Sequence, residues 1–212
     1  MTTTKKSGGR QSDLDVARRV LAHEAAGLAA LSAVLDESFV KAVDLMEAAK
    51  GRVVVSGMGK SGNIAQKITA TLASTGTPAQ YVNAAEASHG DLGMITLQDV
   101  VLTLSYSGET AELSDLVAFT RLMKIPLIAV SGRAGSSLDK AGDVSLVLPE
   151  MDEACPNNLA PTTSTTAMMA LGDALAVALL VAENHVSCRT GWVRWGHVSG
   201  FPECRSSRTI VI

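Results

Sequence analysis

The sequence is poor in aromatic residues and cysteines, and it carries no large excess of charge of either sign. Aromatic side chains make up 3% of the 212 residues, and the cysteines are Cys155, Cys188 and Cys204. Their number and spacing fit neither a disulfide framework nor a zinc-binding pattern, so we expect reduced thiols and a cytoplasmic protein. The formal charge of −3 gives no general attraction to nucleic acid or to an anionic membrane, and neither is an expected partner.

Long apolar runs are also lacking. No stretch of about 18 consecutive apolar residues is present, so a membrane-spanning helix is not expected. The N-terminus has two lysines without an apolar segment behind them, and it therefore does not resemble a secretory signal. We predict that residues 1–11 form a flexible arm in front of the folded domain.

What the chain does have is enough apolar residues for a folded domain, since 47% are hydrophobic and 18% are charged. Its length suits one α/β domain with a substantial core. A helix is predicted from about residue 12, because apolar residues follow helical spacing at Val16, Val20, Leu21, Ala25, Leu28, Leu31 and Leu35. A second helix is predicted over residues 38–50, and Gly51 follows at a position typical of a helix C-terminus.

The spacing of apolar residues then changes to that of strands. Val53, Val54 and Val55 form a β-branched run, typical of a strand buried on both faces. Further strands are predicted at residues 80–82, 100–105, 127–130 and 143–148, and helices at residues 63–74, 111–123 and 162–183. This alternation predicts a mostly parallel sheet with its sites at the carboxyl ends of the strands. Three loops rich in glycine and serine lie there, at residues 56–62, 105–110 and 131–137.

The second of these loops has the composition of a phosphate-binding turn. Ser105, Ser107 and Thr110 bring three hydroxyls together, and Gly108 lets backbone N–H groups approach a ligand closely. Placed before a helix that starts near Glu112, they would form a phosphate cradle that needs no cation. The alternative is an ordinary Ser/Thr helix cap followed by a turn.

The first loop, GMGKSG at residues 57–62, superficially suggests a nucleotide-binding fold. The spacing of its first two glycines excludes a P-loop, and Asn83 stands where a dinucleotide fold needs an acidic residue. Lys60 follows the buried strand closely and could steer a phosphate or an oxyanion. The alternative is a solvated loop cation.

Two further segments hold candidate residues. His89 lies next to a glycine and near two acidic residues in a spacing that is no metal-binding signature, and the nearby glycines favour a ligand loop over a plain surface histidine. Glu153 comes just after the last predicted strand. The segment after Glu153 can also serve simply as a helix cap, through Thr162 or Thr163.

Four motifs in this order resemble the sugar isomerase (SIS) domain, and more narrowly the arabinose-5-phosphate isomerases: SGMGKSG, STGTPAQYVNAAEASHGDLGM, SYSGET and EACPNNLAPTTSTTAMMALGDALAVALL. The resemblance covers about residues 12 to 184. It implies a three-layer α/β/α fold with a five-stranded parallel sheet and N-terminal helices, assembled as a homotetramer. It also implies interconversion of D-ribulose 5-phosphate and D-arabinose 5-phosphate for Kdo, lipopolysaccharide or capsule synthesis, without cofactor or metal.

The resemblance places Lys60, Glu112 and Glu153 at catalytic positions. Isomerisation through an enediol needs a base beside the carbonyl carbon, and a carboxylate of raised pKa suits that role. Either Glu153 or Glu112 is the expected proton-transfer group. Positive charge must stabilise the enediolate oxygen, and Lys60 or a histidine could supply it. The residues implied to contact substrate or phosphate are Ser61, Gly76, Thr77, His89, Ser105, Ser107, Gly108 and Thr110.

Three features depart from the family pattern. Asn83 stands where a histidine able to bind inhibitory metal is common. The chain is too short to include the CBS domains that many members carry. The active-site His-Pro-Gly-Gly motif that follows the long helix is missing, and His185 and His197 lack its neighbours.

Residues 187–212 differ in composition from the predicted domain, residues 12–186. They hold both tryptophans, Trp192 and Trp195, but no alanine or leucine, and they carry a net charge of +3. We interpret them as a frameshifted or otherwise replaced C-terminus, expected to be poorly ordered and to impair activity. A basic interaction tail is the alternative.

Two other functions are compatible with the sequence. A phosphosugar-binding SIS module without catalysis would explain the missing histidine. An isomerase of another sugar phosphate would use the same loops.

Overall fold

The computed structural model describes residues 7–184, with side chains for Ser12 to Ala182. Residues 1–6 of the predicted arm and the predicted tail, residues 187–212, lie outside the described residues. The rest of the arm is helical, since the first helix, α1, spans Ser7–Val34 and so begins before the predicted start at residue 12.

Five parallel strands form one sheet in the order β2-β1-β3-β4-β5. They are β1 Val53–Gly57, β2 Ala79–Asn83, β3 Val100–Ser105, β4 Leu127–Ser131 and β5 Val144–Val147. The five-stranded parallel sheet expected from the sequence is thus confirmed. β1 and β3 lie inside the sheet and are buried along their whole length, as their continuous apolar runs predicted.

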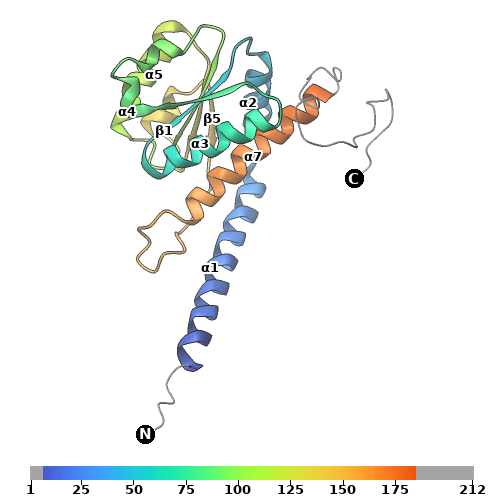
Figure 1. The fold of residues 1–212 in the computed structure, drawn as a ribbon, viewed down its shortest axis with the longest axis vertical. Coiled ribbons are helices and arrows are strands. Elements are labelled where there is room, and N and C mark those ends of the chain that lie inside the picture. The colour runs from blue at the N-terminus through green and yellow to red at the C-terminus, as the bar shows by residue number, and fades with distance from the viewer. Residues whose placement is uncertain (1–6, 185–212) are drawn as a thin grey trace.

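Helices cover both faces of the sheet (Figure 1). The larger hydrophobic core lies on the face covered by α2 Glu37–Ala48, α3 Gly59–Ser74 and α7 Thr163–Asn184. The other face carries a smaller core and is covered by α4 Ala84–Ala87, α5 Ser114–Met123 and α6 Ser137–Ala141. Two single turns of 3₁₀ helix, η1 Asp91–Met94 and η2 Ala111–Leu113, precede β3 and α5.

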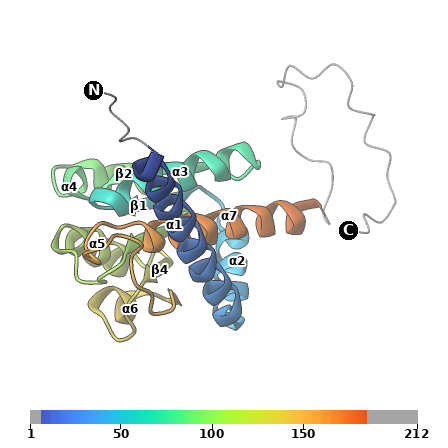
Figure 2. The same cartoon turned by 90° about the horizontal axis from the view of Figure 1, so that it is seen from below.

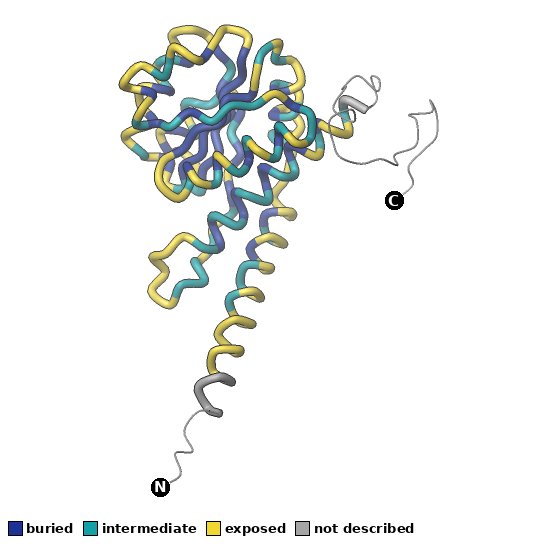
Figure 3. The backbone as a smooth tube through the Cα atoms, in the orientation of Figure 1, coloured by how far each residue is buried: buried dark blue, intermediate teal, exposed yellow. Residues whose placement is uncertain are grey.

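The first helix extends away from the sheet, and its C-terminal end joins the core (Figure 1, Figure 3). Leu31 is buried, whereas Val16, Leu21 and Leu28 of the predicted apolar stripe are exposed. The predicted helix is confirmed, but most of its apolar residues do not reach the core. Apolar residues at helical spacing identify an amphipathic helix, but they do not show which part of that helix packs against the rest of the domain. Seen from below, α1 crosses α7, which it contacts (Figure 2).

Among the described helices, α7 is long and apolar enough to cross a membrane by length and composition, over Thr163–Ala182. Its surroundings are those of a core helix. Leu171, Leu175 and Leu179 are buried in the larger core, and α7 contacts α1, α2 and α3.

Two element boundaries differ from the sequence prediction. α3 begins at Gly59 rather than at residue 63, so the last residues of the predicted loop form the first helical turn. The second helix ends at Ala48, before Gly51. Gly51 instead lies against Asp99, with whose carboxylate a Cβ atom at this position would overlap. The short helices α4 and α6 were not predicted, because a single turn shows no apolar period.

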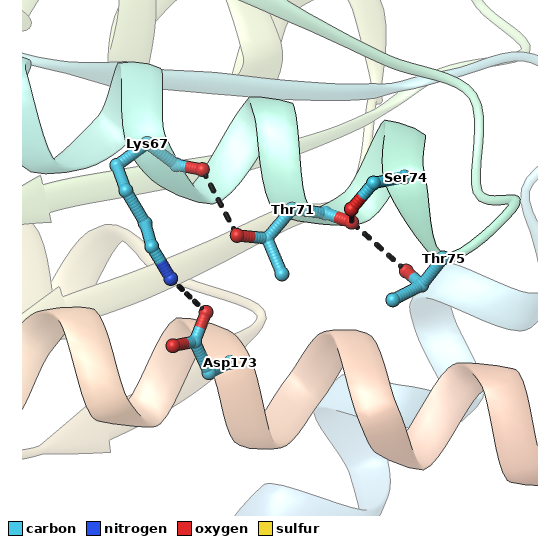
Figure 4. A network of polar contacts seen from close by, with 5 residues as sticks. All are labelled: Lys67, Thr71, Ser74, Thr75 and Asp173. Carbon is cyan, nitrogen blue, oxygen red and sulfur yellow. Dashed lines mark hydrogen bonds and ion pairs between the residues drawn. The ribbon is translucent and has the colours of Figure 1, made fainter.

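Close packing joins α3 to α7. A Cβ atom at Gly172 of α7 would overlap with the side chain of Ile68 on α3. Beside this contact, Lys67 Nζ forms an ion pair with Asp173 Oδ1, next to threonine and serine hydroxyls that bond back to carbonyls of α3 (Figure 4). Both charged side chains are partly exposed, and such pairs contribute at most about 1 kcal/mol. The close approach at Gly172 is therefore expected to affect the stability of this interface more than the ion pair does.

Gly172→Val is expected to lower the free energy of unfolding by about 1–3 kcal/mol, the usual cost of overpacking a filled core. The loss should appear although valine favours helices more than glycine does. Urea unfolding followed by circular dichroism measures it. Ala29→Val, on an exposed part of α1, is the control and should cost less than about 1 kcal/mol. Equal stability of Gly172→Val and the parent protein would contradict the packing described.

Candidate functional site

A cavity of about 960 Å³ opens at the carboxyl edge of the sheet. Its wall consists of residues that follow β1, β3 and β4, the segment between β5 and α7, and the start of α7. This is the edge at which parallel α/β sheets carry their sites. Its titratable and hydroxyl-bearing lining residues include Lys60, Ser61, Tyr106, Ser107, Thr110, Arg133, Glu150, Asp152 and Glu153.

The turn after β3 brings its three hydroxyls together, as the sequence predicted. Ser105 Oγ lies 2.7 Å from Thr110 Oγ1 and 3.5 Å from Ser107 Oγ. The backbone N–H of Gly108 donates to Ser105 Oγ at 3.0 Å. Gly108 has a φ of 68°, which favours glycine. Ser105 is buried beneath the turn, while Ser107 and Thr110 line the cavity.

The first turn of α3 supplies the next wall of the cavity. Lys60 is exposed there and lines the cavity with Ser61. Ser61 Oγ donates to Met168 Sδ of α7 at 3.8 Å. Because α3 starts at Gly59, the position of Lys60 is set by a helix rather than by a loop.

Glu153 lies between the cavity and the N-terminus of α7. Its Oε2 accepts hydrogen bonds from the N–H of Thr162 at 2.6 Å, from Thr162 Oγ1 at 3.0 Å and from the N–H of Ser164 at 3.3 Å. Its Oε1 accepts a bond from the Ser164 hydroxyl. Partial burial raises the pKa of Glu153, but these four bonds outweigh it and hold the pKa below its ordinary value. The chemistry had favoured a raised pKa, so this direction differs from the expectation.

The predicted helix-cap role of this segment and the role of Glu153 turn out to be connected. The Thr162 carbonyl accepts the bond from the N–H of Thr166 that opens α7, so Thr162 is the capping residue. Its side chain, however, accepts from the N–H of Ala154 and donates to Glu153. The Glu153 carboxylate thus satisfies N–H groups that the helix start leaves free.

Tyr106 and Arg133 are among the cavity residues that were not selected from the sequence. The Tyr106 hydroxyl donates to the Met151 carbonyl at 3.3 Å, and partial burial together with the charge of Glu153 raises the pKa of Tyr106. Arg133 is exposed and follows β4. The signal for both was available, because each lies in a loop that the carboxyl-end rule had singled out.

Besides Ser105 and Gly108, which belong to the turn itself, four predicted site residues do not line this cavity. Glu112 on η2 and His89 after α4 are exposed and do not line it. Gly76 and Thr77 precede β2 and so lie at the opposite edge of the parallel sheet. Within a single chain these four residues therefore do not share the cavity with Lys60, and their predicted roles stay predictions.

Asn83, which stands where a metal-binding histidine was expected from the resemblance, has a structural role in the described chain. Asn83 accepts a hydrogen bond from the N–H of Ala85 at 3.0 Å and caps α4. Within residues 7–184, no three His, Cys, Asp or Glu side chains gather so that they could hold a metal ion. Cys155 is a free thiol, and the other two cysteines lie outside the described residues.

Comparison with known proteins gives consistent matches. The family model of the SIS domain matches residues 45–178. Arabinose 5-phosphate isomerase KdsD of Pseudomonas aeruginosa is 54% identical over 166 residues, covering 78% of this chain and 51% of that protein. KdsD of Escherichia coli K12 is 51% identical over 165 residues, covering 78% and 50%. The chain therefore spans about half the length of these relatives.

A solved structure matches over a larger share of its own length. The structure of c3406 from Escherichia coli CFT073, in complex with arabinose 5-phosphate, superposes with a TM-score of 0.79 and is 36% identical. The match covers 82% of this chain and 93% of that one.

Glu153→Gln is expected to lower the stability of the fold at neutral pH by about 0.5–2 kcal/mol, the range for losing a helix cap. Because folding lowers the pKa of Glu153, the carboxylate stabilises the protein above its ordinary pKa of about 4.5. This advantage is lost as the pH falls through the lower folded value. Unfolding curves between pH 3 and pH 7 should therefore converge at the acid end. Glu47→Gln, which removes an exposed carboxylate on α2, is the control. A stability difference between Glu153→Gln and the parent protein that does not change with pH would contradict the account.

Proposed function

The chain belongs to the SIS domain family, and from this premise we propose that it is an aldose–ketose isomerase interconverting D-ribulose 5-phosphate and D-arabinose 5-phosphate. The observation that carries the proposal is one cavity lined by three kinds of group. They are the turn at residues 105–110, called the hydroxyl turn below, the lysine Lys60 and the carboxylate of Glu153. The name shared by relatives at about half identity supports the choice of substrate.

The hydroxyl turn suits the phosphate end of the substrate. Ser107 and Thr110 face the cavity, and Ser105 orients them from below through its own hydrogen bonds. Hydroxyls and backbone N–H groups are neutral donors that bind phosphate oxygens without the cost of burying a charge. With the phosphate at this turn, the carbonyl end of a five-carbon sugar extends toward the rest of the cavity.

Glu153 is the proposed proton-transfer group. Its lowered pKa keeps it ionised at neutral pH, so that it can accept a proton. It takes one from C1 of ribulose 5-phosphate, and the electron pair moves onto the C2 oxygen to give an enediolate. A proton then passes from the C1 hydroxyl to the C2 oxygen, and Glu153 returns its proton to C2, which yields the aldose. A substrate that displaces the Ser164 hydroxyl would raise the pKa of Glu153 and strengthen the base.

Lys60 is the proposed electrostatic partner of this step. Its ammonium group stabilises the negative charge that develops on the C2 oxygen. Lys60 and Glu153 line one cavity, whereas Glu112 does not line it. This difference favours Glu153 over Glu112 as the base.

The wider role follows from the same resemblance. The product would supply Kdo for lipopolysaccharide or capsule synthesis, in the cytoplasm. We further propose a homotetramer, which would give the exposed apolar residues of α1, among them Leu14, Val16 and Leu21, a surface to pack against.

The purified chain is expected to convert D-ribulose 5-phosphate into D-arabinose 5-phosphate. The reaction is measured by ¹H NMR of the C1 proton of the aldose. Its rate should be the same before and after treatment with a chelator. A folded protein that sugar phosphates stabilise but that converts none of them would be a binding module. Conversion of a hexulose phosphate in preference would assign another substrate.

Glu153→Gln should lower kcat by at least about 100-fold, the usual contribution of a positioned acid–base group. Thermal stabilisation by arabinose 5-phosphate should persist. Glu112→Gln, the matched exposed variant, should keep kcat within about threefold of the parent. Loss of activity in Glu112→Gln with normal turnover in Glu153→Gln would transfer the role to Glu112.

A further inference from the structure

Arg133 occupies a position beside the hydroxyl turn that the sheet itself defines. β3 and β4 are paired in parallel, and Ser105 lies opposite Ser131 in the register. Ser107 and Arg133 are each two residues beyond that pair. Neighbouring parallel strands lie about 4.8 Å apart, so the two residues leave the sheet side by side and enter the same cavity.

The backbone around Arg133 is fastened to the hydroxyl turn. The N–H of Gly132 donates to the Tyr106 carbonyl at 2.9 Å. A Cβ atom at Gly132 would overlap with the Tyr106 ring, so only glycine allows this contact. The Arg133 carbonyl accepts bonds from Ser131 Oγ and from the N–H of Ser136, both at 3.3 Å. The start of the Arg133 side chain is therefore held in place relative to the turn.

Arg133 forms no ion pair with a described carboxylate, although its charge helps to lower the pKa of Glu109, and Glu150 and Asp152 line the same cavity. In the part of the chain that the structure describes, the ion pairs are Arg18 with Asp15 and Lys67 with Asp173. The neighbouring carboxylate, Glu109, bonds instead to the N–H and hydroxyl of Ser137. The guanidinium of Arg133 is exposed and lines the cavity.

We propose that Arg133 binds the phosphate of the substrate together with the hydroxyl turn and so selects phosphorylated sugars. This inference rests on the proposed function for the identity of the sugar. In the sheet order β1-β3-β4, the hydroxyl turn lies between Lys60 after β1 and Arg133 after β4. A guanidinium binds two phosphate oxygens at once through paired N–H groups. Arg133 balances the negative charge of the phosphate, so the Lys60 ammonium group remains available to stabilise the enediolate.

Binding of inorganic phosphate to the folded chain tests this inference without any need for turnover. Half-maximal thermal stabilisation of Arg133→Gln should require about 10- to 100-fold more phosphate than the parent does, the range for losing hydrogen bonds to a charged group. Arg133→Lys keeps the charge but loses the paired geometry, and it should lie between the two. Arg121→Gln, on an exposed part of α5 that does not line the cavity, should match the parent. Ser107→Ala removes one hydroxyl of the turn, and its loss of phosphate affinity gives a scale against which the loss in Arg133→Gln is compared.

Kinetics provide the second readout. In Arg133→Gln the KM for ribulose 5-phosphate should rise by about the same factor while kcat changes less than about threefold. Unchanged phosphate affinity and KM in Arg133→Gln, or a loss confined to kcat, would overturn the inference. Failure of the parent protein to bind millimolar phosphate would overturn it as well. Phosphate binding that depends on Arg133 in a chain without turnover would refute the proposed isomerase and leave the phosphate site standing.

Discussion

The parallel pairing of β1, β3 and β4 is the constraint on which the site depends. Gly57 pairs with Leu104 and Ser105 with Ser131, so three segments far apart in the sequence leave the sheet at one edge. Each segment then has a fixed start: α3 begins at once, the hydroxyl turn closes on Gly108, and the third segment is fastened to Tyr106. The buried β-branched and leucine side chains of β1 and β3 hold this edge in place, which links the hydrophobic core directly to the chemistry.

The fourth wall of the cavity depends on a polar contact instead. Between β5 and α7 the chain forms neither helix nor strand, and three polar contacts set its position. Glu153 accepts from the N–H of Thr162 at the start of α7, and the Met151 carbonyl accepts from the Tyr106 hydroxyl. The third contact joins the Asp152 carbonyl to His23 Nε2 of α1, at 2.8 Å. Glu153 therefore has two roles that draw on one carboxylate. As a helix cap it is held ionised, and as a base it must release at least one of its bonds. A substrate that displaces the Ser164 hydroxyl from Glu153 would raise the pKa of the carboxylate, so substrate binding itself would make Glu153 a stronger base.

The strands of the sheet were predicted well because buried parallel strands consist of continuous apolar runs. For β3, both the first and the last residue were predicted correctly. The start of α3 was predicted poorly, because glycines at positions 59 and 62 are typical of loops, while the structure uses them in a helical turn. The apolar stripe of α1 was identified, but nothing in a single sequence shows what covers it. In the site, the hydroxyl turn was found because its residues are adjacent in the chain. His89, Gly76 and Thr77 do not line the cavity, because tertiary packing decides which edge or face a loop residue joins, and their predicted contacts with substrate stay predictions.

The central claim is that this cavity moves a proton between C1 and C2 of a pentose phosphate through an enediolate. Its most direct test is the conversion of ribulose 5-phosphate in D₂O, with ¹H NMR of the aldose formed. The account predicts that arabinose 5-phosphate brought to equilibrium with ribulose 5-phosphate carries deuterium at C2, because repeated transfers let the proton held by Glu153 exchange with solvent. No arabinose 5-phosphate, or a product without deuterium at C2, would contradict it.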